Sequence, residues 1–114
     1  MDDVKRLKEF GVILLRCFED TTSGLLGEGA KKALLERLEK DTGLKRDELI
    51  VQTEMLKSGM EKIFGRSALV LERMIAKQIY GKLGLDTPPL DFEAAIKQAE
   101  QAYVKGIPTI LVSR

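Results

Sequence analysis

The sequence of 114 residues contains no histidine and no tryptophan, and it has one cysteine and three prolines. Without histidine, a catalytic arrangement that needs a histidine base and a zinc site built on histidine are both excluded. A single cysteine excludes an intramolecular disulfide. Positive and negative charges nearly cancel, with 19 basic against 18 acidic residues. A protein that binds nucleic acid through overall charge would be more basic.

Long apolar runs are also missing. No stretch approaches the roughly 18 apolar residues that a membrane span requires. Asp2 and Asp3 near the start and the short apolar run at residues 12–15 do not resemble a signal peptide. We therefore expect a cytoplasmic protein without a membrane partner. The absence of asparagine and histidine, together with many lysine, glutamate and arginine residues, also suggests a thermophilic source.

What the chain has in abundance is helix-forming residues. Leucine occurs 17 times, against 14 for valine and isoleucine together, and aromatic residues make up 5 %. This mixture favours helix over sheet. We predict an all-α fold, a single compact domain of about five helices over residues 1–106, followed by an extended, β-like tail at 107–114. Apolar spacing and helix-ending residues place the helices at about 3–19, 30–42, 54–64, 67–83 and 92–105.

Two regions leave alternatives open. Residues 44–53 fit either a short helix or an extended connection. The β-like tail cannot satisfy its own backbone hydrogen bonds as a lone strand. It can pair with residues near Ile50, pair with a second copy of the chain, or pack irregularly.

The predicted helices carry more apolar surface than one buried stripe needs. The first helix has a wide apolar face, helix 67–83 is apolar on two sides, and the tail is apolar as well. Surplus apolar surface of this kind marks protein interfaces. We therefore expect a non-enzymatic interaction module that binds itself as a homodimer, or binds another protein. The interface candidates are Val12, Ile13, Leu15, Val70, Met74, Ile110 and Val112.

A DNA-binding regulator is the alternative prediction. Residues 33–57 have the approximate layout of a helix-turn-helix, with the turn at 41–44. Glu39 argues against this layout, because the motif normally has a small buried residue there. In this alternative the residues facing DNA are Lys45, Arg46 and Gln52.

No residue pattern indicates catalysis. The glycines at 24, 27 and 29 precede a helix, but no strand leads into them and no Gly-Lys-Ser/Thr follows, so they form neither a dinucleotide fingerprint nor a phosphate-binding loop. No metal-ligand spacing occurs either. We expect no enzyme activity, no cofactor and no metal.

Two stretches resemble each other. Leu25-Leu26-Gly27-Glu28-Gly29-Ala30 leads into a helix that ends in Gly43-Leu44. Ile63-Phe64-Gly65-Arg66-Ser67-Ala68 leads into one that ends in Gly84-Leu85. Over about residues 24–85 these motifs resemble a family of small, uncharacterised archaeal helical domains. The resemblance implies an archaeal source and an all-α fold, and it implies no reaction.

Overall fold

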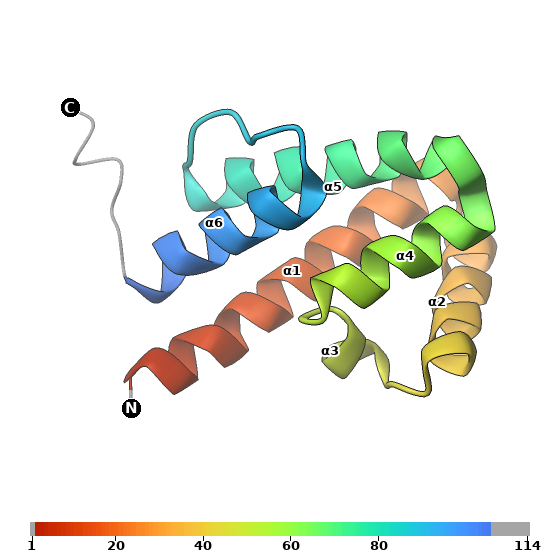
Figure 1. Ribbon diagram of the computed structural model, residues 1–114, viewed down its shortest axis with the longest axis horizontal. Helices are drawn as coiled ribbons and strands as arrows, with labels where there is room; N and C mark the ends of the chain where they lie inside the picture. Colours follow the sequence, from red (N-terminus) through yellow and green to blue (C-terminus); the bar gives the residue numbers. More distant parts are fainter. Residues whose placement is uncertain (1, 106–114) are drawn as a thin grey trace.

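The protein is a bundle of helices (Figure 1). The structure is a computed structural model, and it describes residues 2–105. Those residues include no β-strand, so the predicted all-α class is confirmed. The tail at 107–114, with the interface candidates Ile110 and Val112, lies outside the described residues. The elements are α1 (Asp2–Leu26), α2 (Glu28–Thr42), α3 (Arg46–Leu49), α4 (Thr53–Phe64), the 3-10 turn η1 (Gly65–Ser67), α5 (Ala68–Leu83) and α6 (Phe92–Val104).

The first helix is longer than predicted. The sequence predicts an end near residue 19, because Thr21-Thr22-Ser23-Gly24 interrupts the apolar spacing, but α1 continues to Leu26. Both threonines are buried, and the Thr22 hydroxyl donates a hydrogen bond of 2.6 Å to the backbone carbonyl of Phe18, one turn earlier. The Thr22 hydroxyl is thereby satisfied inside the helix. The Thr21 hydroxyl is buried without a hydrogen-bond partner among the described residues, so packing and not a side-chain hydrogen bond keeps Thr21 helical.

Two glycines make the sharp connections between successive long helices. Gly27 alone links α1 to α2 with φ of 92°, and Gly65 follows α4 with φ of 61°. Residues with a side chain rarely adopt such positive φ values, which explains the glycines of the two similar sequence stretches. Ser67, a residue type that often caps helices, directly precedes α5. It makes no capping hydrogen bond, because its own backbone is helical, with φ of −64° and ψ of −20°, whereas a capping residue is normally extended.

The core forms around α1, which packs against α2, α3, α5 and α6. In Figure 1, α5 and α6 lie along one side of α1, and α2 crosses near its C-terminal end. Val4 and Leu7 near the start of α1 have the helical spacing of a buried face but are exposed. On α2, Leu35 is buried while Ala30 and Ala33 are exposed. The largest fully buried side chains include Phe10, Leu14, Phe18, Leu38, Met60, Ile75 and Ile79.

Helix α6 lies antiparallel to α1, with its C-terminal end beside the start of α1. The Tyr103 hydroxyl donates a hydrogen bond of 3.0 Å to Glu9 Oε1, and Arg6 Nη1 donates one of 3.3 Å to the Tyr103 carbonyl. The N-terminus of α6 is capped by Asp91, whose carboxylate accepts a hydrogen bond from the Ala94 amide. These contacts hold the C-terminal end of α6 beside the start of α1.

The region left open by the sequence, residues 44–53, is a short helix followed by a turn. Helix α3 covers only Arg46–Leu49, and α4 begins at Thr53. The continuous second helix of a helix-turn-helix, expected over 45–57, is therefore not formed. Leu49 and Ile50 are buried, so packing of these two residues bends the chain into the core instead of extending one helix past them.

Candidate functional site

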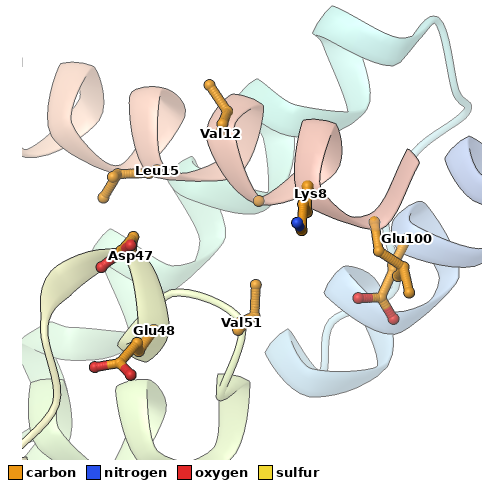
Figure 2. A pocket seen from close by; sticks show the side chains of 9 residues that line it. Lys8, Val12, Leu15, Asp47, Glu48, Val51 and Glu100 are labelled. Atoms are coloured by element: carbon orange, nitrogen blue, oxygen red, sulfur yellow. The ribbon is translucent and has the colours of Figure 1, made fainter. Parts of the chain in front are cut away.

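A groove of about 600 Å³ opens between three parts of the bundle (Figure 2). Successive turns of α1 form its floor. Helix α3 and Val51 form one wall, and Glu100 of α6 lies at one end. The residues that line it are Leu7, Lys8, Gly11, Val12, Leu15, Asp47, Glu48, Val51 and Glu100. We call this feature the α1 groove.

Gly11 lets the wall approach the floor closely. A Cβ atom placed on Gly11 would lie 3.3 Å from Val51 Cγ1, which is tighter than an ordinary van der Waals contact. Glycine in the interior of a helix costs about 0.5–1 kcal/mol relative to alanine. At Gly11 the missing side chain permits a close contact between α1 and Val51 in the α3–α4 connection.

The middle of the α1 groove is apolar and open to solvent. Val12 is 62 % exposed, Val51 46 % and Leu7 41 %. Figure 2 shows the charged residues around them: Asp47 and Glu48 lie on α3 near Leu15, whereas Lys8 and Glu100 lie toward the other end. An apolar strip with a charged border is the usual composition of a surface that binds another polypeptide.

The sequence-predicted interface residues divide into separate groups. Val12 and Leu15 line the α1 groove, whereas Ile13 is half-buried and packs against the core. Val70 and Met74 are on α5, where they are 60 % and 38 % exposed. The structure therefore places these candidates on two different helices, and only Val12 and Leu15 lie in the groove.

The residues predicted to face DNA are not equally available. Lys45 and Gln52 are exposed, but Arg46 is engaged in ion pairs. Arg46 Nε lies 3.3 Å from Glu39 Oε2, and Arg46 Nη1 lies 3.6 Å from Glu19 Oε2. The backbone N–H of Arg46 also donates to Glu39 Oε2 at 2.8 Å, and this hydrogen bond, with those of the guanidinium, lowers the pKa of Glu39. Glu39 thus joins α2 to α3.

A second cluster of charged groups lies between α4 and α5. Glu72 of α5 is only 4 % exposed, and its Oε2 has no hydrogen-bond partner among the described residues. Burial raises the pKa of Glu72 to about 7, assisted by a hydrogen bond and charge repulsion from Glu61 and opposed by Lys57. Lys57 Nζ lies 3.2 Å from Glu61 Oε2. This pair of carboxyl groups can hold one proton near neutral pH.

The sequence analysis missed Glu72 and Val51. Glu72 had a readable signal, because it follows Ala68 by four residues and precedes Ile75 by three, which places it on the apolar face of α5. Val51 had none, because its exposure depends on where the chain turns after α3.

Two classes of site have no representative in the part of the chain that the structure describes. No group of three or more cysteine, aspartate or glutamate side chains in residues 2–105 is arranged to hold a metal ion. None of the helices there combines the length and apolarity needed to cross a membrane.

Comparison with known proteins gives no match: no family model, no curated protein and no solved structure is significantly similar to this chain. Function must therefore be argued from the groove itself.

Proposed function

We propose that this domain is a non-enzymatic interaction module that forms a homodimer through the α1 groove. The observation that carries the proposal is the concave apolar surface formed by Leu7, Val12 and Val51, all of which are exposed in a single copy. Removing apolar surface from water contributes about 25 cal/mol per Å². A groove shaped by three parts of the fold offers more area to a partner than an isolated side chain does.

The charges around the groove support a second copy as the partner. Lys8 lies toward one end, and Asp47 and Glu48 lie toward the other (Figure 2). In a twofold-symmetric dimer both copies offer the same groove to each other. The border of each groove carries both signs of charge, because Glu100 accompanies Lys8 at one end, and it therefore suits a partner of nearly balanced charge such as the second copy.

Sedimentation velocity of the full chain, from about 5 to 200 µM, tests the proposal. We expect the mass to rise from one copy to two over this range, which corresponds to a micromolar dissociation constant. Val12→Asp places a charge on the floor of the groove and should keep the protein monomeric. Val12 is exposed in a single copy, so the substitution should leave the fold intact, as circular dichroism would show.

Val70→Asp is the matched control. Val70 is as exposed as Val12 but lies on α5, so this variant should dimerise like the original chain. A monomer at all concentrations overturns the proposal, and so does a dimer that Val70→Asp abolishes and Val12→Asp does not. Binding to random duplex DNA that weakens steeply with salt would instead favour the DNA-binding alternative, because such salt dependence reports phosphate contacts.

A further inference from the structure

Helix α6 runs toward the start of α1, so its axis points away from the far end of the groove. Tyr103, near the end of α6, contacts Arg6 and Glu9 near the start of α1. The α1 groove runs from Lys8 toward Leu15, which is opposite to the direction of α6. A tail that filled its own groove would have to reverse directly after Lys105.

A twofold axis removes the need for that reversal. Consider a twofold axis that is perpendicular to α6 and passes near its C-terminal end. The partner's groove is then rotated by half a turn relative to the groove of the first copy. The partner's groove then begins beside the partner's Glu100 and runs onward in the direction in which the first chain leaves α6. Exchange of identical segments between two copies is a common route to a homodimer.

The tail is long enough to cover the floor of this groove. From Leu7 to Leu15 the groove floor is about 12 Å long at 1.5 Å per helical residue. Residues 107–112, when extended, span about 20 Å. Side chains alternate in an extended chain, so Pro108, Ile110 and Val112 share one apolar face.

Charge is complementary as well. Arg114 follows the apolar face of the tail, and the groove ends at the carboxylates of Asp47 and Glu48. A chain that enters beside Glu100 brings its arginine toward this acidic end, where the opposite charges attract.

We infer that the segment occupying the α1 groove is residues 107–112 of a second copy of this chain, exchanged reciprocally between the two subunits of the dimer. This inference rests on the proposed homodimer and names the part of the partner that binds. It joins Val12 and Leu15 of the groove to Ile110 and Val112 of the tail in one interface.

Disulfide trapping between two single variants of the full chain tests the exchange. Val12→Cys protein and Ile110→Cys protein are mixed in equal amounts with oxidised glutathione and analysed on a non-reducing gel and by mass spectrometry. A link between residue 12 of one chain and residue 110 of the other is expected. The native Cys17 interferes little, because it is buried and burial raises its pKa, which disfavours the reactive thiolate.

The matched control replaces Val12→Cys by Val70→Cys, which presents an equally exposed thiol on α5. The 12–110 link should form at least about ten times faster than the 70–110 link, because effective concentration governs thiol–disulfide exchange between docked segments. Independently, the double substitution Ile110→Asp with Val112→Asp should weaken dimerisation at least about tenfold, whereas Thr109→Asp, on the other face of the tail, should not.

The outcomes separate the two claims. A dimer in sedimentation without a 12–110 link above the control rate overturns the tail assignment and leaves the proposed homodimer standing. A monomer at all concentrations overturns both. A link that forms within one chain of the Val12→Cys/Ile110→Cys double variant, but not between the mixed single variants, places the tail in its own groove and overturns the exchange.

Discussion

Replacing Glu72 by glutamine should stabilise the protein at alkaline pH and leave it nearly unchanged in acid. Glu72 is buried between α4 and α5 beside Glu61, and one of its oxygens has no hydrogen-bond partner in the described residues. Glutamine keeps the shape of the side chain and removes its titration. The substitution therefore isolates the free energy of ionising one buried carboxyl group.

The magnitude follows from the pKa of Glu72, which burial raises from 4.5 to about 7. Between these values the folded protein holds a proton that the unfolded chain releases, so the free energy of unfolding falls as pH rises. The contribution of the neutral carboxyl is fully present below pH 4.5 and is lost above about pH 7. At about 1.4 kcal/mol for each pKa unit, the loss is about 3 kcal/mol.

Urea denaturation followed by circular dichroism at pH 4.5, 6 and 8 measures this difference. The gain in unfolding free energy of Glu72→Gln over the original chain should grow from near zero at pH 4.5 to as much as about 3 kcal/mol at pH 8. Glu36→Gln, at an exposed position of α2, should change stability by less than about 0.5 kcal/mol at each pH. If Glu72→Gln destabilises the protein at pH 8, attraction to Lys57 outweighs the cost of burial and the reasoning is refuted.

Two further predictions concern packing. Gly59→Ala should destabilise the protein by about 1–3 kcal/mol in chemical denaturation, because its Cβ would lie 2.6 Å from Cδ2 of the fully buried Leu38. Gly81→Ala on α5, where nothing lies within 4 Å, should instead stabilise by about 0.5–1 kcal/mol, and equal effects at both sites would contradict the packing argument. Ile75→Ala should cost about 2–5 kcal/mol, because Ile75 is fully buried, and a loss below about 0.5 kcal/mol would show that the core is misplaced.

The parts of the fold that could be predicted are those that local patterns specify. Gly43 and Gly84 end α2 and α5 in the left-handed conformation, as their positions after apolar helical runs indicated. The end of α1 could not be predicted from local pattern. Thr21 and Thr22 favour a break in isolation, but burial against the bundle and a hydrogen bond within the helix outweigh that preference.

The candidate site was less predictable than the fold. Val12 and Leu15 could be selected because they are apolar residues outside a single buried face of the helix. The wall of the groove, however, comes from α3 and Val51, more than 30 residues later in the sequence. Whether such a wall exists depends on the turn between α3 and α4, which no residue pattern specified. Periodicity identifies apolar side chains that lie outside the buried face of a helix. It does not identify the part of the chain that lies across from them.

The central position of α1 has a consequence for synthesis of the chain. Its apolar face, which includes Phe10 and Leu14, packs against α5 and α6, and α6 begins only at Phe92. At about 5–20 residues per second, a ribosome needs roughly 4–16 seconds to go from Leu14 to Phe92. Helix α2, joined to α1 through Gly27, is the first element made that can cover part of the face. The α1–α2 hairpin is thus the nascent chain's first protection against aggregation.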